Sequence, residues 1–118
     1  MQYYFGNAAD DGQDDRGWFL GYFMRGRRSE LYSNDVELKW STHQRGEGGD
    51  HPVSETNVST SVCILIAGEM HLVFGVETVK MSTLGDYVKW GPGVPHAWMA
   101  AENETTVITV RWPSAKPE

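Results

Sequence analysis

The hydrophobic and polar positions of this chain alternate in short runs. From Trp18 onward, segments rich in β-branched and aromatic residues are separated by glycine, asparagine and aspartate. No window carries a capped apolar stripe with the ~3.6-residue period of an amphipathic helix. Many short strands divided by turn residues are typical of a sandwich or a barrel, not of alternating strands and helices. We therefore predict a mostly β fold.

The pattern predicts eight strands, with turns at residues 67–69, 84–86 and 102–104. Residues 59–67 and 70–74 flank Gly68 and are expected to form a hairpin. The predicted strands cover residues 18–24, 36–43, 59–67, 70–74, 76–81, 87–90, 97–101 and 105–112.

The segment 36–43, VELKWSTH, alternates most regularly, so its residues fall on two faces. One face carries Val36, Leu38, Trp40 and Thr42, and the other carries Glu37, Lys39, Ser41 and His43. Two interpretations are open at this point. Either the polar face is solvated, or it lines the interior of a barrel and brings a cation, a hydroxyl and an imidazole into one column.

Two segments lack a strand pattern. Residues 7–17, NAADDGQDDRG, are expected to form an acidic loop, so residues 1–17 are predicted to be an N-terminal arm and 18–118 a single β-barrel domain. Residues 44–57, QRGEGGDHPVSETN, are a second irregular loop. This second loop is either a lid over a site or a solvent loop without a role.

Length and charge exclude several classes of protein. A chain of 118 residues can bury one apolar core, and the single Cys63 allows no internal disulfide. The formal net charge of -6 argues against nucleic-acid binding, which needs a concentrated basic face. No segment approaches the ~20 apolar residues of a membrane span. We expect a cytoplasmic protein that binds neither nucleic acid nor membrane.

Residues 85–98, GDYVKWGPGVPHAW, place three glycines and two prolines around His96. The order Gly85, Pro92, Gly93 and His96 resembles the second conserved motif of the cupin superfamily. Upstream, CILIAGEMHLVFG resembles the strand–turn–strand segment of the same family. The resemblance spans about residues 36–112 and implies an all-β fold, the double-stranded β-helix or cupin jelly-roll barrel, with little or no helix.

The glycines and prolines around His96 have a physical role of their own. Glycine permits backbone angles that other residues avoid, and proline fixes φ. A stiff turn holds His96 at a set position, as an acid/base group or a ligand requires. We therefore predict His96 as the catalytic candidate. The alternative is that the turn only closes a corner of the barrel and that His96 bonds locally.

The resemblance also implies a metal site, but its first motif is incomplete here. Ser41 and Ser61 stand where metal-binding cupins carry a histidine and a glutamate, so His43 and His96 remain as candidate ligands. A divalent transition metal generally needs three or four protein ligands. The second loop offers His51, Glu55, Glu47 and Asp50 as further donors. Whether a divalent metal is the cofactor is therefore left open.

We predict that a small molecule binds inside the barrel around His43 and His96, which approach each other there. The expected ligand-binding residues are His43, Lys39, Ser41, Trp90 and Trp98, with Lys39 as the partner of an anion. The alternative function is a non-catalytic barrel that serves dimerisation or effector sensing and retains a vestigial site.

The segment GWFLGYFM, residues 17–24, is apolar on both faces of its predicted strand. An edge strand of this kind leaves an aromatic surface that monomers rarely expose. A two-fold partner that presents the same strand would cover it. We therefore expect a homodimer. The alternative is that the aromatic residues of the arm, Tyr3, Tyr4 and Phe5, fold over this face and leave a monomer.

Overall fold

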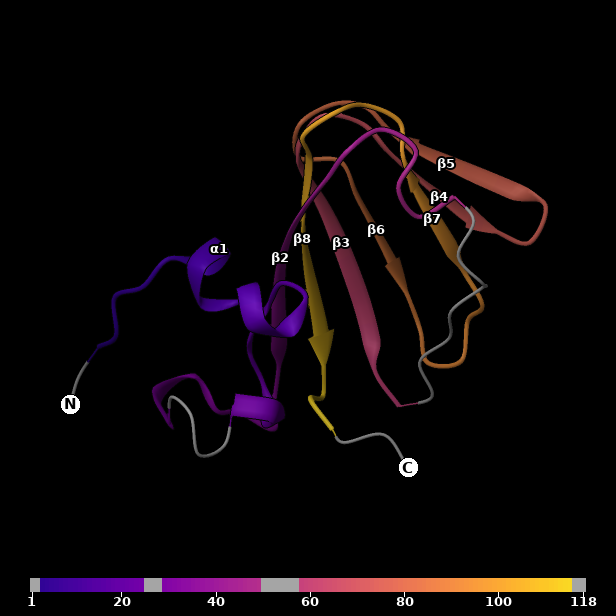
Figure 1. Cartoon of the computed structure of the whole chain (residues 1–118). Helices are drawn as coiled ribbons and strands as arrows, with labels where there is room; N and C mark the ends of the chain where they lie inside the picture. The colour runs from indigo at the N-terminus through magenta and orange to yellow at the C-terminus, as the bar shows by residue number, and fades with distance from the viewer. Residues whose placement is uncertain (1–2, 25–28, 50–57, 116–118) are drawn as a thin grey trace.

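Two antiparallel sheets face each other in the computed structural model, which describes residues 3–24, 29–49 and 58–115 (Figure 1). The larger sheet has the order β1-β2-β8-β3-β6, and the smaller has the order β5-β4-β7. The strands are β1 (Trp18–Leu20), β2 (Glu37–His43), β3 (Thr60–Ala67), β4 (Met70–Phe74), β5 (Glu77–Met81), β6 (Tyr87–Trp90), β7 (Ala97–Ala100) and β8 (Thr105–Trp112).

The chain passes repeatedly from one sheet to the other. Strands β2 and β3 lie in the larger sheet, β4 and β5 in the smaller, and β6, β7 and β8 then alternate between the two. This is the connectivity of a jelly roll. The prediction of an all-β barrel with little helix is therefore confirmed.

The turn at Gly68 does not form the expected hairpin. Strand β3 pairs with β6 and β8, whereas β4 pairs with β5 and β7, so the turn carries the chain between sheets. Gly68 has a φ of 79°, and a Cβ there would lie 2.4 Å from Thr105 Oγ1. The positive φ and the close approach of Thr105 together require glycine at this corner.

The N-terminal segment also differs from expectation. Residues 7–17 contain a short helix, α1 (Ala8–Asp11), and a 3₁₀ turn at Gln13–Asp15, where a loop was expected. The Asn7 side chain caps α1 by accepting a hydrogen bond of 3.1 Å from the Asp10 backbone N–H. Figure 1 shows this segment beside β2, outside the space between the sheets.

The predicted strand at residues 18–24 ends early. Strand β1 stops at Leu20, and Tyr22–Met24 form a 3₁₀ turn in which the Met24 N–H donates to the Gly21 carbonyl at 3.3 Å. Phe23 packs edge-on against Trp18, with ring centroids 6.1 Å apart. Because the turn brings these aromatic rings together, none of the side chains in this segment is fully exposed.

The core lies between the sheets and is lined mainly by apolar side chains. Its buried members are Cys63, Leu65, Met70, Leu72, Met81, Trp90 and Val107. Among the described residues, no helix has both the length and the apolar character needed to cross a membrane.

Candidate functional site

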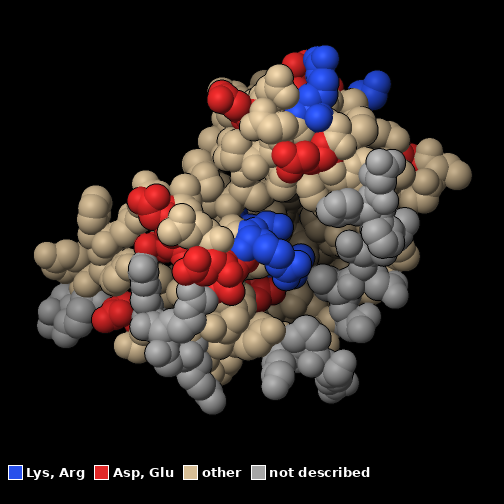
Figure 2. Space-filling view, viewed as in Figure 1, with Lys and Arg blue, Asp and Glu red and all other residues tan. Residues whose placement is uncertain are grey.

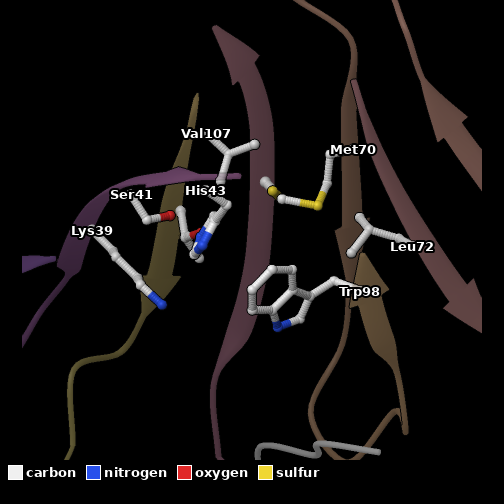
Figure 3. Close-up of a pocket in the computed structure, with 9 residues that line it drawn as sticks. Lys39, Ser41, His43, Met70, Leu72, Trp98 and Val107 are labelled. Carbon is white, nitrogen blue, oxygen red and sulfur yellow. The ribbon is translucent and has the colours of Figure 1, made fainter. Parts of the chain in front are cut away.

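The polar face of β2 points into the barrel. Glu37 and Ser41 are buried, and Lys39, Ser41 and His43 line a cavity of about 60 Å³ between the sheets. Figure 3 shows these three side chains pointing from β2 toward the opposite sheet. Of the two interpretations of residues 36–43, the structure therefore supports the inward one. The remaining lining residues are Cys63, Met70, Leu72, Trp98, Val107 and Thr109.

The opposite wall of the cavity is apolar and aromatic. Trp98 reaches in from β7, and its ring centroid lies 4.5 Å from that of His43 at a tilt of 47°. Met70 and Leu72 of β4 complete this wall (Figure 3). A ligand in the cavity would therefore meet a flat aromatic surface on one side and polar groups on the other.

The first part of the second loop packs on β7 and on Trp98, which lines the cavity. The Gly46 N–H donates to the Ala100 carbonyl at 2.8 Å, and the Ala100 N–H donates to the Glu47 carbonyl at 3.0 Å. Gly48 lies directly on Trp98, since a Cβ there would come within 2.4 Å of the indole ring. These contacts hold residues 44–49 against β7. Asp50, His51 and Glu55 lie outside the described residues.

The loop also places a carboxylate on His43. Glu47 Oε2 lies 3.1 Å from His43 Nδ1, and Glu47 Oε1 accepts the Gln44 backbone N–H at 2.9 Å. A carboxylate at Nδ1 favours the proton on that nitrogen, which leaves Nε2 with a lone pair in the neutral ring. The pair therefore has the arrangement of a histidine that can accept a proton at Nε2.

Lys39 is a cation in a largely apolar surrounding. Burial lowers the pKa of Lys39 below its usual value, and the charges of Arg111 and Arg16 lower it further. The Lys39 ammonium lies 5.5 Å from the centre of the Trp18 ring. No carboxylate among the described residues pairs with it at ion-pair distance. The cavity thus contains a positive charge that a bound anion would neutralise.

The structure places His96 in a different group of side chains from His43. Its buried ring packs on Trp90, with centroids 4.6 Å apart, and lies 6.2 Å from the Phe74 centroid. His96 Nδ1 lies 3.0 Å from the Val94 carbonyl, so this nitrogen carries the proton. His96 does not line the cavity that contains His43.

No contact between the two imidazoles is found among the described residues, and how closely they approach stays a prediction. Each ring packs on its own tryptophan, His43 on Trp98 and His96 on Trp90. Both histidines still lie inside the barrel. Gly93, in the connection to His96, has a φ of 77° and open space around its Cα, so the backbone angle is what favours glycine there.

A second polar group lies farther along the same inner face. Glu37, Arg111, Ser61 and Trp90 are direct neighbours across β2, β8, β3 and β6. Arg111 Nη1 lies 3.6 Å from Glu37 Oε1, and the Arg111 guanidinium lies 4.5 Å from the centre of the Trp18 ring. Burial raises the pKa of the Glu37 carboxyl and lowers that of Arg111.

Sequence analysis did not identify Arg111 or Glu37 as site residues. The only indication in the sequence was that Glu37 lies two residues before Lys39, and therefore on the same face of the strand. Arg111 joins that face because it pairs with Glu37 in the structure. Figure 2 shows basic side chains near the centre of one face of the molecule, beside a hollow in the surface and next to acidic side chains. Charged side chains of both signs therefore lie beside this hollow.

The described residues do not supply a complete set of metal ligands. No group of three or more histidine, cysteine, aspartate or glutamate side chains is close enough together in this part of the chain to hold an ion. His43 and Glu47 are two adjacent donors, and His96 lies apart from them. Ser61, at the position where the resemblance implies glutamate, faces Arg111 and Trp90 instead.

Solved structures resemble this fold. A cupin protein from Bacteroides fragilis superposes with a TM-score of 0.69 at 13% identity and covers 100% of this chain and 90% of its own. KdgF from Halomonas sp. gives a TM-score of 0.63 at 18% identity, covering 70% of this chain and 74% of its own. This chain has the cupin fold.

A further cupin-like match is HppE in a cobalt(II) form, with a TM-score of 0.57 at 17% identity, covering 66% of this chain and 46% of the other. The sequence itself matches no protein-family model and no curated protein. The likeness to cupins therefore lies in the fold, which confirms the resemblance drawn from residues 85–98. The chemistry of this cupin barrel has to be argued from its own side chains.

Proposed function

We propose that this cupin barrel binds a small organic anion in the cavity lined by Lys39, Ser41, His43 and Trp98. The observation that carries the proposal is Lys39, an inward-pointing cation with no carboxylate partner among the described residues. A buried charge costs folding free energy unless it is paired, and a ligand can supply the missing partner.

The shape of the cavity restricts the ligand. A volume of about 60 Å³ holds only a few non-hydrogen atoms below the surface. Trp98 offers a flat apolar wall, while Ser41 offers a hydroxyl that can donate or accept. These features suit a small acid with a short apolar or planar body.

The His43–Glu47 pair supports a second function, proton transfer on the bound anion. Glu47 orients the ring through Nδ1, so Nε2 is the nitrogen available to accept a proton. Lys39 would then stabilise negative charge that develops on the ligand. In this account His43, and not the predicted His96, is the acid/base candidate. The HppE neighbour carries cobalt, which supports testing this barrel for metal as well.

Calorimetric titration tests the binding proposal. We expect saturable binding of acetate or benzoate at constant ionic strength, and much weaker binding of the neutral analogues acetamide and benzamide. The variant Lys39→Met should weaken anion binding at least tenfold, while Lys80→Met, which removes an exposed lysine from β5, should not. Equal binding of acids and amides, or unchanged binding in Lys39→Met, would contradict the proposal.

Elemental analysis of the untagged protein tests the metal separately. About one equivalent of a transition metal, lost in His43→Ala or His96→Ala, would show that other residues complete the ligand set. Proton exchange on a bound acid that disappears in His43→Gln would favour catalysis over the alternative of an effector-sensing barrel. Binding without exchange would favour that alternative.

The expected homodimer stays a proposal, but we now place its interface on a different surface of the molecule. Residues 18–24 are partly covered within the chain, whereas the outer face of the larger sheet carries the half-buried apolar residues Leu38, Trp40, Ile64, Ile108 and Val110. We expect sedimentation at micromolar concentration to give a dimer that Ile108→Asp splits. A single species near 13 kDa would contradict it.

A further inference from the structure

Three buried polar atoms lie in one row of the larger sheet without a hydrogen-bond partner among the described residues. They are Arg111 Nε, Ser61 Oγ and Trp90 Nε1. Ser61 pairs directly with Arg111 on one side and with Trp90 on the other. Side chains on directly paired residues share a face, with Cβ atoms about 5 Å apart. The three side chains therefore lie next to one another on one face of the sheet.

The three unpaired atoms require a hydrogen-bond acceptor as their partner. Arg111 Nε and Trp90 Nε1 can only donate, while Ser61 can donate or accept. Ser61 is fully buried and Trp90 is 8% exposed, so bulk solvent does not satisfy them. Native proteins keep few buried polar groups unpaired, and clusters of them call for a specific explanation. An oxygen-rich group between Arg111 and Trp90 would satisfy all three.

The charge around the row favours an anion. Arg111 has one long contact of 3.6 Å with Glu37, whose Oε2 also accepts a hydrogen bond of 3.2 Å from Ser114. Lys39 lies two residues from Glu37 along β2, on the same inner face, and also approaches the Trp18 ring. Among the described contacts, the Glu37 carboxylate lies at ion-pair distance from Arg111, and no carboxylate lies at that distance from Lys39. An added negative charge would balance the second cation.

We propose that Arg111, Ser61 and Trp90 bind the carboxylate of an organic acid whose remainder extends past Lys39 toward Trp98. This inference rests on the proposed binding of an anion in the barrel and names its class and its anchor. Arg111 pairs with Glu37, which lies two residues, or about 7 Å, from Lys39 along β2, so an acid held at Arg111 lies beside Lys39 on the same inner face. Phe74 and His96 pack on Trp90 and hold the indole in place.

The indole of Trp90 provides a direct measurement. Its Nε1–H resonance can be assigned in a ¹H–¹⁵N spectrum as the indole signal that disappears in Trp90→Phe. Titration with acetate or benzoate at constant ionic strength should shift this signal downfield with saturation, because a charge-assisted hydrogen bond forms. Sodium chloride and acetamide should leave the signal in place.

Two variants test the anchor, with one control. Arg111→Gln should weaken the acetate response at least tenfold, and Ser61→Ala should weaken it severalfold. Lys89→Gln removes an exposed positive charge next to Trp90 on the outer face of β6 and should change nothing. If Arg111→Gln does not fold, Ser61→Ala, which deletes a single hydroxyl, still decides the outcome.

The outcomes separate this inference from the proposed function. An unmoved Trp90 indole, with calorimetric binding of acetate that still depends on Lys39, would overturn the anchor alone. Loss of both signals in wild-type protein would overturn both proposals. A Trp90 response to phosphate as strong as that to acetate would overturn the assignment to carboxylic acids. An acetate shift that persists unchanged in Ser61→Ala and Arg111→Gln would also overturn it.

Discussion

The two sheets present opposite chemistry to the space between them. The inner face of the smaller sheet is apolar, with Met70, Leu72 and Met81 almost fully buried. The inner face of the larger sheet carries polar groups, among them Lys39, Ser61 and Arg111, next to apolar residues. Burial of apolar area supplies most folding free energy, while buried polar groups lower it unless they are satisfied. We therefore expect the smaller sheet to contribute mainly to folding free energy, and the larger sheet to supply the polar contacts with the proposed ligand.

This contrast predicts that substitutions on the two walls act on different properties. The largest effect is expected at Leu72, which is 3% exposed and belongs to the core cluster. Leu72→Ala should lower the free energy of unfolding by about 2–5 kcal/mol, since it removes buried methyl groups and leaves a cavity. Denaturant unfolding measures this. A loss below about 1 kcal/mol would show that the smaller sheet is not the stabilising wall.

Cys63 gives a second test of the contrast between the two sheets, because it lies on the larger sheet but belongs to the apolar core. Burial raises the pKa of its thiol from 9.0 to about 11. The folded state then keeps a proton that the unfolded state releases, so stability falls as pH rises from about 9 to 11. Two pKa units correspond to about 3 kcal/mol. Unfolding titrations should show this loss in wild type, and a smaller pH dependence in Cys63→Ala.

Lys39 should affect binding more than folding. Its lowered pKa means that the anion site loses its cation at a lower pH than an ordinary lysine would. We expect acetate affinity to fall as pH rises through that pKa, and a bound anion to raise the pKa again. In Lys39→Met, affinity should be at least tenfold lower, which is about 1.4 kcal/mol, and independent of alkaline pH. A wild-type affinity that stays constant up to pH 10.5 would argue against Lys39 as the partner.

Ser61→Ala should have the smallest effect on folding. Its Oγ is buried without a partner among the described residues, so its removal should change the free energy of unfolding by within about 1 kcal/mol, in either direction. Thermal unfolding of the ligand-free protein checks this. A loss of several kcal/mol would mean that the hydroxyl has a structural partner and that the wall is built for folding.

Much of the fold was predictable from the sequence because it depends on local patterns. The period of two in residues 36–43 placed Lys39, Ser41 and His43 on one face, and the structure confirms that placement. The predicted hairpin at Gly68 was wrong because local patterns do not show which strands pair. A tight turn between two apolar strands looks the same in sequence whether the strands pair or separate into two sheets.

The site was less predictable because long-range contacts assemble it. Glu47 contacts His43 from a loop that bonds to Ala100, and His96 packs on Trp90. Arg111 is the next-to-last residue of β8, and nothing local marks it as inward-facing. Its place on the inner face follows from the register that sets it beside Ser61.

The most direct test of anion binding inside the barrel is a crystal structure of the untagged protein grown with benzoate, beside one grown with benzamide. The account predicts the benzoate carboxylate on the cations of the larger sheet, within hydrogen-bond distance of the Lys39 ammonium or of Arg111 Nε, with the ring toward Trp98, and no benzamide in the same place. A cavity that holds only water in both crystals, or benzoate bound solely on the outer surface, would contradict it.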